Sequence, residues 1–302
     1  MSRRRTGLFQ LQHRYAPYLF VAPFLVLFCT FGLYPLVKSV VLSFFITSGP
    51  ASRIFVGLDN FRFLFTDPDF GRACLNTAVF AAFSVFLQLP MSLGLALLLN
   101  RKDLRGRNLF RLCFFSPRLV GMVFVGVLFS LIFAARFGLL NVALHRLFGA
   151  SLETDWLNTK PLIMPALVLT SLWMYVGFNM IYFLAALQNV DRTLYEAATV
   201  DGAGAWQQFW HVTLPGIKPV AIFVIILSTI GSFQLFELPY LMLGNSRGAG
   251  DAGLTIVMYL YENGFVTGDL GYASTIGWTL ALGVLILAIG QMYFTGTWRK
   301  EP

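Results

Sequence analysis

The pentapeptide Gly244–Gly248, which reads G-N-S-R-G, fits the G-x-S-x-G pattern that surrounds the nucleophile of serine hydrolases. A serine nucleophile needs a base such as histidine within hydrogen-bond reach. Of the three histidines, only His145 is expected on the same side of the apolar runs as Ser246, and no motif accompanies it. Because turns use Gly, Asn and Ser freely, we interpret the pentapeptide as a glycine-rich turn.

Gln234 and Glu237 stand nearly one helical turn apart in the apolar stretch F-Q-L-F-E-L-P-Y. A carboxylate at membrane depth is energetically expensive, so Glu237 is a candidate functional residue. In a water-filled cavity it can accept hydrogen bonds from ligand hydroxyls. Alternatively it lies near the outer interface or bonds a neighbouring helix, and the sequence leaves both interpretations open.

A third group combines aromatic and amide side chains in one apolar stretch: Trp173, Tyr175, Asn179 and Tyr182. Aromatic rings with polar tips suit the apolar face and hydroxyl rim of a sugar. Helix packing and interfacial aromatic belts explain the same residues more simply. Lys38 and Arg118 also lie in or beside apolar stretches, and we expect both to extend their charged ends to the membrane surface.

The composition explains why these polar residues stand out. Of 302 residues, 57% are hydrophobic and 12% are charged, whereas soluble domains carry about 25% charged residues. The net charge of +8 would suit nucleic acid, but the basic residues lie in loops between apolar runs, where membrane topology explains them. The scattered cysteines, Cys29, Cys74 and Cys113, predict neither a disulfide framework nor a metal site. The chain therefore reads as a multi-pass membrane protein.

Several apolar runs exceed the roughly 20 residues that cross a bilayer. We predict an all-α polytopic protein with six transmembrane helices at residues 17–46, 74–99, 112–135, 162–187, 220–243 and 272–295. The first run is too long for a signal-peptide core and lacks a clean cleavage site, so we expect it to remain as an uncleaved helix. In the last run, Ala273, Gly277 and Ala281 recur every fourth residue, which permits close helix packing either inside the subunit or at a dimer seam.

The distribution of Lys and Arg predicts the orientation, because these residues concentrate in cytoplasmic loops. Most fall on one side of the predicted spans, which places both termini and the segment 189–219 in the cytoplasm. The basic residues on that side are Arg3, Arg4, Arg5, Arg14, Arg101, Lys102, Arg105, Arg107, Arg111, Arg192, Lys218, Arg299 and Lys300. The outer 48–73 loop carries an amphipathic stretch that we expect along the membrane surface.

The segment Thr193–Pro219 is the longest stretch of the chain in which polar residues regularly interrupt the apolar sequence. Thr193 and Glu196 have the spacing of a capping box, which predicts a helix start. Gly202 can take the left-handed conformation that ends a helix. A second helix is expected from 203 to 211, stopped by Pro215, with Pro219 in the first turn of the next span.

The same segment resembles the EAA loop of ABC importer permeases. The match consists of Glu196-Ala197-Ala198, three residues, Gly202, nine residues, Val212, one residue, and Leu214-Pro215. Val212 replaces the more usual Ile, and Asp191 stands where many relatives have Pro. Further motifs resemble the sugar-uptake branch, specifically the first of the two permease subunits in oligosaccharide and glycerol-phosphate importers: Ala22-Pro23, G-L-D-N-F, D-P-D-F, Leu97–Asn100 and G-Y-A-S at Gly271–Ser274. The G-G-P signature of this branch is degraded to G-N-S-R-G, which leaves the individual substrate open.

The resemblance implies a type I ABC importer (MetI-like) permease fold, with one transmembrane permease domain over residues 1–302 and a cytoplasmic coupling loop over 189–219. It implies that this loop docks on a cytoplasmic ATPase dimer, which binds the ATP, since the chain lacks a phosphate-binding loop of its own. A second permease subunit would complete the pathway, and an extracytoplasmic binding protein would deliver the solute. The expected coupling residues are Glu196, Ala197, Ala198, Asp201, Gly202, Ala203, Leu214 and Pro215.

The leading interpretation is thus a permease subunit that carries a sugar or oligosaccharide through the inner membrane of a bacterial-type cell. Glycerol-phosphate, a polyol or another small solute is the alternative. For the substrate pathway we predict Glu237, Gln234, Asn179, Tyr175 and Trp173. An intramembrane enzyme is a remote alternative, because no matched histidine, metal-spaced cluster or cofactor motif accompanies the candidate residues.

Overall fold

The computed structural model describes residues 3–49, 52–101 and 103–296, and the side chains from Tyr15 onward. Of the basic residues used to predict the orientation, Lys102, Arg299 and Lys300 lie outside the described residues. The chain forms two compact units. The first consists of residues 1–66 and 260–278, and the second of residues 67–259 and 279–302. The predicted all-helical class is confirmed, apart from one short hairpin.

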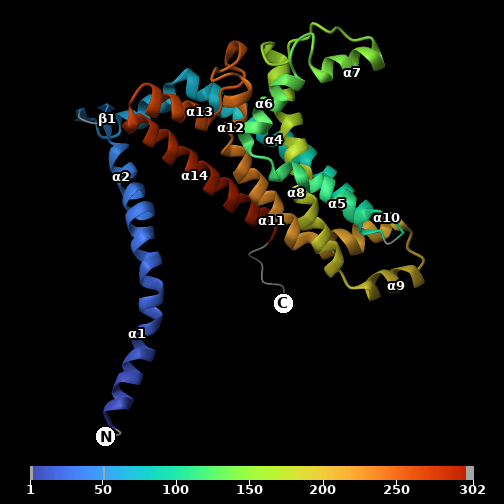
Figure 1. The fold of residues 1–302 in the computed structure, drawn as a ribbon, viewed down its shortest axis with the longest axis horizontal. Coiled ribbons are helices and arrows are strands. Elements are labelled where there is room, and N and C mark those ends of the chain that lie inside the picture. The colour runs from blue at the N-terminus through green and yellow to red at the C-terminus, as the bar shows by residue number, and fades with distance from the viewer. Residues whose placement is uncertain (1–2, 50–51, 102, 297–302) are drawn as a thin grey trace. The chain divides into compact units, whose positions relative to one another are not determined.

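The helices vary widely in length along the chain (Figure 1). Their bounds are α1 (Arg3–Leu27), α2 (Tyr34–Leu42), α3 (Asp59–Thr66), α4 (Pro68–Asn100), α5 (Arg107–Phe115), α6 (Met122–Ile132), α7 (Leu139–Phe148), α8 (Lys160–Asn189), α9 (Arg192–Val200), α10 (Ala205–Gln208), α11 (Leu214–Phe233), α12 (Glu237–Met242), α13 (Ile256–Tyr261) and α14 (Leu270–Phe294). π-helical turns join α1 to α2 over Phe28–Leu33 and α10 to α11 over Phe209–Thr213.

Within the described part of the chain, five helices are long and apolar enough to cross a membrane: Tyr15–Leu42, Pro68–Asn100, Lys160–Asn189, Ala205–Phe233 and Leu270–Phe294. A sixth span is reached only by counting a bent pair, Arg107–Leu119 and Met122–Ile132, as one. The two members of this pair meet at 100°. The expected total of six is compatible with this arrangement, and two of the expected spans need correction.

The third span was expected as a continuous helix over 112–135, and this is wrong. Its first half ends in the 3-10 turn Ser116–Leu119, and Val120 and Gly121 are extended. Pro117 within this turn lacks a backbone N–H, so one hydrogen bond of the helical ladder is missing where the chain bends. The break leaves Arg118 at a bend rather than at a helix end.

The fifth span was expected over 220–243, and both ends are wrong. The helix is already under way at Ala205 and ends at Phe233, and the short helix α12 follows after a break. Pro239 cannot donate a hydrogen bond to Leu235, which leaves that carbonyl free for another donor. The carbonyl of Leu235 instead accepts the hydroxyl of Thr255 at 2.7 Å. Glu237 therefore lies in the first turn of α12 and outside the long helix.

Helix α8 is the centre of the second unit and packs against α4, α11 and α5. Gly177 lets α5 approach it closely, because a Cβ at this position would lie 1.8 Å from the carbonyl oxygen of Phe114. Small residues at such crossings allow helix backbones to pack tightly in lipid. The hydroxyl of Ser92 on α4 donates to the carbonyl of Val176 on α8 at 2.8 Å, which adds a buried polar tie between the two long helices.

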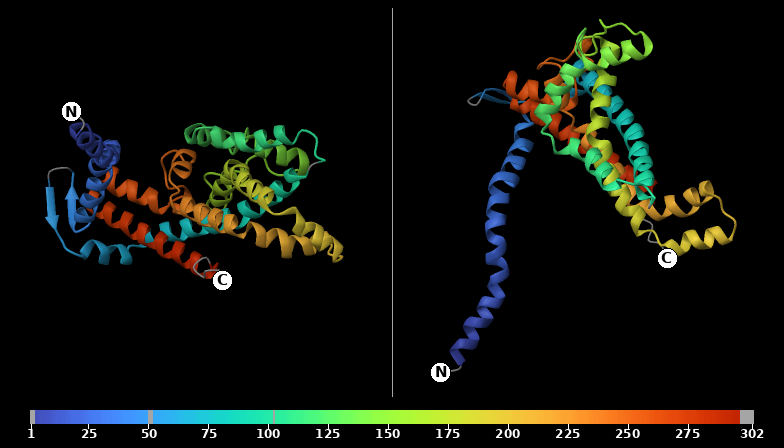
Figure 2. Two further views of the ribbon diagram at one scale, coloured as in Figure 1. Left: turned by 90° about the horizontal axis from the view of Figure 1, so that it is seen from below. Right: turned by 45° about the vertical axis from the view of Figure 1, so that its right-hand side comes forward.

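The first unit contains the only β-strands in the described residues. Strands β1 (Phe45–Ser48) and β2 (Ser52–Phe55) pair antiparallel, with Phe45 opposite Phe55 (Figure 2). The carboxylate of Asp269 accepts the backbone N–H of Thr47 at 3.1 Å and ties this hairpin to the start of α14. The expected amphipathic stretch is the helix α3.

Part of the small-residue stripe in α14 packs inside the first unit. A Cβ at Gly277 would lie 3.2 Å from the side chain of Leu260, and one at Gly264 would lie 2.9 Å from Ala273. The third member, Ala281, is exposed. For Ala273 and Gly277, the structure thus favours the intrasubunit alternative.

Candidate functional site

A cavity of about 700 Å³, partly open to the outside, lies within the second unit. Helices α4, α8 and α11 supply most of its wall, with single contributions from Met122 and α12. Its lining consists of Phe80, Gln88, Met122, Ser171, Tyr175, Phe178, Asn179, Tyr182, Val224, Leu227, Ser228, Gly231, Ser232, Leu235 and Leu238. The described residues of this lining carry no formal charge, and hydroxyl and amide groups alternate with aromatic and aliphatic ones.

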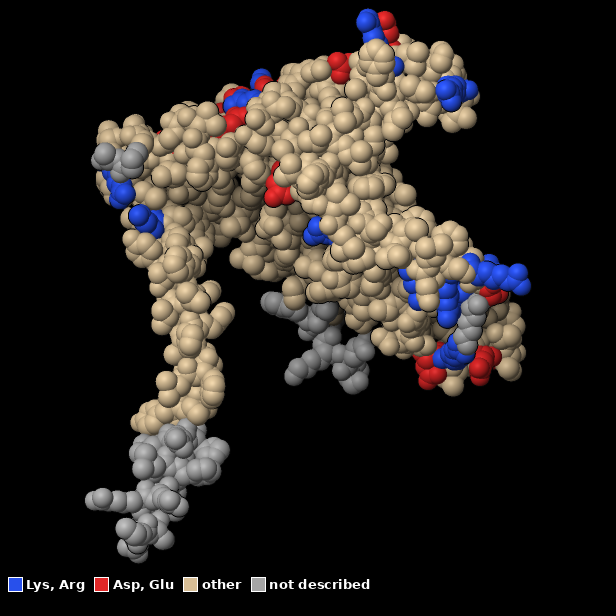
Figure 3. Space-filling view, in the orientation of Figure 1, with Lys and Arg blue, Asp and Glu red and all other residues tan. Residues whose placement is uncertain are grey.

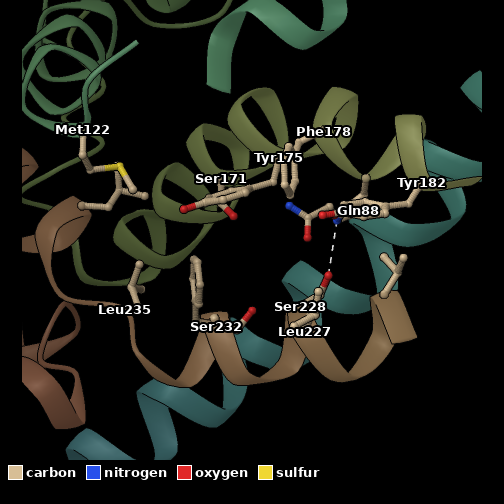
Figure 4. Close-up of a pocket in the computed structure, with 15 residues that line it drawn as sticks. Gln88, Met122, Ser171, Tyr175, Phe178, Tyr182, Leu227, Ser228, Ser232 and Leu235 are labelled. Carbon is tan, nitrogen blue, oxygen red and sulfur yellow. Dashed lines mark hydrogen bonds between the residues drawn. The ribbon is translucent and has the colours of Figure 1, made fainter. Parts of the chain in front are cut away.

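The spacing of the lining residues follows from helix geometry. On α8, Ser171, Tyr175 and Phe178 stand four and three residues apart, which places them on one face. On α11, Ser228 and Ser232 are four residues apart and stand on the opposite wall. Figure 4 shows the two rows facing each other across the cavity, with Gln88 of α4 between them.

Two amide side chains of the cavity are buried, and one of them is hydrogen-bonded to protein. Asn179 is 6% exposed, and its Nδ2 donates to the Ser228 hydroxyl at 3.3 Å. Gln88 is 3% exposed and brings a second amide to the same region. Buried polar groups that keep donor or acceptor capacity in a water-accessible cavity can exchange hydrogen bonds with a hydroxylated ligand.

The bend in the third span positions a guanidinium group beside the cavity. Arg118 lies with its Cζ 5.3 Å from the ring centre of Tyr175 and 5.5 Å from that of Phe178. A cation held over ring faces gains electrostatic stabilisation. Arg118 is exposed, and the aromatic side chains of α8 lie against its charged end. That it extends to the membrane surface stays a prediction.

The structure brings two of the five predicted pathway residues, Tyr175 and Asn179, to this cavity. Gln234 and Glu237 are exposed and lie outside its lining, although their neighbours Leu235 and Leu238 line it. Trp173 points to a separate groove and packs on Phe129, with ring centres 5.2 Å apart. Tyr182, named with the same aromatic group, lines the cavity.

Sequence reasoning missed the four short polar groups Gln88, Ser171, Ser228 and Ser232. Their signal is spacing: Ser171, Tyr175 and Asn179 recur every fourth residue, as do Ser228 and Ser232. Such rows of polar residues in apolar helices mark faces turned away from lipid.

The segment 189–219 lies at the end of the second unit where α8 gives way to α9. None of the residues of α9 is buried, and Leu194 and Val200 are 52% and 88% exposed. Charged side chains gather around α9 and α10 in Figure 3, while much of the neighbouring surface is uncharged. This helix thus presents a free face with both apolar and charged groups.

The start of α9 differs from the expectation. Asp191 is the N-cap, and its carboxylate accepts the backbone N–H of Thr193 at 2.9 Å. Thr193 therefore lies inside the first turn, and the capping box with Glu196 is wrong. The backbone N–H and then the hydroxyl of Thr193 lower the pKa of Asp191. An ionised Asp at this position also suits the positive end of the helix dipole.

The end of α9 follows the expectation. Gly202 has φ of +80°, in the left-handed region, and the N–H of Ala203 donates to the carbonyl of Ala198 at 2.8 Å. The amide of Gln208 then donates to the Thr199 hydroxyl at 3.0 Å and to the Ala203 carbonyl at 3.1 Å. These bonds fix α9 and α10 as a helical hairpin.

Pro215 does not stop the second helix as expected. The chain continues from α10 through the π-helical turn Phe209–Thr213 into α11, with Pro215 in the first turn and Pro219 further inside. A π turn widens the backbone ahead of the proline ring, which otherwise clashes with the carbonyl four residues earlier. The hairpin is therefore joined to α11 without a loop, and the Tyr195 hydroxyl and Thr213 Oγ1, 3.0 Å apart, brace the junction.

Two hollows flank the hairpin. One has about 530 Å³ of space and is lined by Ala198, Asp201, Gly202, Ala203, Gln207, Gln208, His211 and Val212. The other has about 1060 Å³ and is lined by Asn100, Arg107, Leu187, Gln188, Val190, Arg192, Tyr195 and Glu196. Of the remaining predicted coupling residues, Ala197 is exposed on α9, and Leu214 and Pro215 begin α11.

The pentapeptide Gly244–Gly248 is a turn, as expected. Gly244, Asn245 and Gly248 all have positive φ. The hydroxyl of Ser246 donates to the carbonyl of Leu243 at 2.6 Å, so its proton is engaged by the backbone. The arrangement is that of a local turn rather than a nucleophile held by a base.

Comparison with known proteins identifies the family. A family model described as "binding-protein-dependent transport system inner membrane component" matches residues 88–299. The chain belongs to this family. The permease also matches individual relatives over nearly its full length. It is 38% identical to the arabinooligosaccharides transport system permease protein of Bacillus subtilis (strain 168), over 95% of this chain and 90% of the relative.

Other similarities agree with this assignment. The permease is 37% identical to the lactose transport system permease protein of Rhizobium radiobacter, over 91% of this chain and 92% of that one. A crystal structure of a bacterial ABC transporter involved in alginate import contains a chain that superposes with a TM-score of 0.84. That match has 23% identity and covers 97% of this chain and 100% of the other, and it supports the fold. The family assignment makes the permease a multi-pass transport subunit and excludes the intramembrane enzyme alternative.

Proposed function

We propose that the permease forms half of the translocation pathway of an ATP-driven importer for a sugar or oligosaccharide. The observation that carries this proposal is the uncharged cavity of the second unit, whose polar and aromatic groups suit a saccharide. Rings of Tyr175 and Phe178 can lie against the apolar face of a sugar, while the amides of Gln88 and Asn179 bond its hydroxyls. Relatives named for arabinooligosaccharide and lactose transport support the same substrate class.

The exposed helix α9 would be the docking element for a cytoplasmic ATPase dimer. Glu196, Ala197 and Ala198 lie on this helix, and the hollow at Gly202 separates it from α10. Since α10 continues into α11, a force applied to the hairpin is transmitted to a helix that lines the cavity. ATP would be bound by the ATPase, and this chain would need no cofactor of its own.

The remaining assembly follows the same proposal. A second permease subunit would close the open side of the cavity, and an extracytoplasmic binding protein would deliver solute at the opposite end from α9. Both termini and the 189–219 segment would then face the cytoplasm. A solved relative described as an alginate transporter in complex with a pentasaccharide-bound periplasmic protein supports the binding-protein part of this scheme.

Uptake of a labelled oligosaccharide by cells that express the whole importer tests the cavity. Tyr175→Ala and Gln88→Ala should lower uptake by about tenfold or more, since each removes a contact that we assign to the ligand. Trp173→Phe is the matched control, because Trp173 lies in the separate groove. Equal uptake by all three variants at equal expression would refute the assignment of the cavity.

An anionic solute such as glycerol-phosphate or an acidic saccharide is the second candidate. The observation in its favour is the guanidinium of Arg118 over the rings of Tyr175 and Phe178. A titration of the cognate binding protein against neutral and acidic sugars separates the two candidates. A neutral oligosaccharide should bind, and uptake should tolerate Arg118→Gln; binding of acidic ligands alone would favour the second candidate.

A further inference from the structure

A second, apolar hollow lies between α4, α5 and α8, on a different face of α8 from the cavity. It has about 1110 Å³ of space, partly open to the outside, and we call it the α4–α5 groove. Its walls are Met91, Gly94, Leu95, Leu98, Cys113, Phe114, Pro117, Leu172, Trp173, Val176 and Gly177. Met91 and Leu98 remain about half exposed, at 49% and 56%, and a Cβ at Gly94 would meet nothing within 4 Å.

The turn that joins α4 to α5 follows directly on these two walls of the groove and is strongly basic. Within residues 101–111, the described part contains four arginines and one carboxylate, Asp103, which pairs with Arg101 at 3.0 Å. Leu98 lies three residues from Arg101, and Phe114 lies three residues from Arg111. Three helical residues advance about 4.5 Å, so the charges begin where the apolar wall ends.

The arginines of this turn keep donor capacity. The Nη2 of Arg111 donates to the carbonyl of Leu99 at 3.1 Å, which satisfies an acceptor at the end of α4. The Nε of the same guanidinium is buried and has no hydrogen-bond partner in the described part of the chain. A buried donor without a partner is costly, and such a group calls for a ligand, ion or water that completes it. The side chains of Arg105 and Arg107 likewise have no hydrogen bond or ion pair within the described part of the chain, and Arg107 also lines the hollow that contains Glu196.

We propose that the α4–α5 groove binds an anionic phospholipid. One acyl chain lies along Met91, Leu98 and Trp173, and the phosphate lies at the basic turn, where guanidinium groups can donate to its oxygens. Basic pockets at the ends of transmembrane helices are known recognition sites for anionic headgroups. A helix from a partner subunit would fill the apolar wall but would leave the arginines without an anion, so the charge favours the lipid.

Quenching of Trp173 fluorescence by brominated lipids tests this site. The full chain is placed in phosphatidylcholine vesicles that contain increasing fractions of dibrominated phosphatidylglycerol or dibrominated phosphatidylcholine. The difference between the protein and Trp173→Phe isolates the signal of this one tryptophan. Trp173 should be half quenched at a several-fold lower fraction of the anionic lipid, with about fivefold preference for each arginine that engages the phosphate.

Three variants and one control complete the test. Arg105→Gln and Arg107→Gln remove charges that form no hydrogen bond or ion pair with the described residues, so they should leave folding intact, and Arg111→Gln removes the guanidinium with the free Nε. Each should lower the preference for phosphatidylglycerol, whereas Arg146→Gln on α7 should leave it unchanged.

Three results would overturn the proposal. Equal quenching by both lipids would mean ordinary boundary lipid, and no quenching by either would mean that protein fills the groove. A preference retained in all three variants would remove the arginines from the headgroup site. The test measures lipid binding alone, so its outcome is separate from that of the transport proposal.

Discussion

Replacing Gly177 with alanine should separate α5 from α8. A Cβ at this position would lie 1.8 Å from the carbonyl oxygen of Phe114 and 2.3 Å from its carbonyl carbon. Ordinary carbon contacts are about 3.5 Å, so the backbones must move apart by more than about 1 Å. Overpacking of this kind costs about 1–3 kcal/mol.

The assay is thermal unfolding of the purified chain in detergent, followed by intrinsic fluorescence. A loss of about 1–3 kcal/mol corresponds to a Tm lower by about 2–12 °C in a domain of this size. Gly94→Ala is the matched control, because it adds the same methyl group to α4 where nothing lies within 4 Å. Its Tm should stay the same or rise, since alanine favours helix. A Tm for Gly177→Ala equal to that of Gly94→Ala would refute the close crossing.

The cavity and the hairpin can each be tested by substitution. Asn179→Leu removes the amide that bonds Ser228 and should lower uptake of the labelled oligosaccharide by about tenfold, whereas Leu227→Met at the same cavity should leave it nearly unchanged; equal uptake by both would contradict the role of the amide. Glu196→Lys and Gly202→Pro should abolish uptake while membrane insertion stays normal, and normal uptake at normal expression would refute the coupling role. Asp191→Ala should speed hydrogen exchange of the Thr193 amide at pH 7. Because the pKa of Asp191 is lowered, the wild-type cap should persist at every pH above the ordinary range of an Asp carboxyl and fail only as the pH falls through that depressed pKa. Fraying of the wild-type helix at neutral pH would contradict this.

The long apolar helices were predictable because composition alone decides them. α4, α8 and α14 each carry an uninterrupted apolar run, and their bounds agree with the expected spans to within a few residues, apart from an earlier start of α4. The end of α9 was also predictable, since Gly202 is a residue that readily adopts positive φ. The start of α9 was predicted wrongly at Thr193, although Asp191 is an equally suitable cap, because Asp is among the strongest N-cap residues.

The bends and the cavity could not be predicted from the sequence in the same way. Pro117 breaks its span, whereas Pro90 and Pro165 lie inside continuous helices, so proline alone does not locate a break. The face of α8 that turns to α11 depends on packing contacts such as that of Gly177 with Phe114 of α5. The sequence of α8 alone does not identify the partner in such a contact. Glu237 was predicted to line the substrate pathway because of its charge. The break before α12 places it outside the lining of the cavity.

We propose above all that this chain carries a saccharide when a partner ATPase hydrolyses ATP. The most direct measurement is ATP hydrolysis by proteoliposomes that contain the permease, its second permease subunit and the ATPase, with binding protein added outside. Hydrolysis should rise, and labelled oligosaccharide should accumulate, only when the binding protein is loaded, and Glu196→Lys should abolish both. Saccharide that equilibrates across the membrane without ATP would contradict this mechanism. So would a rate of ATP hydrolysis that does not depend on the loaded binding protein.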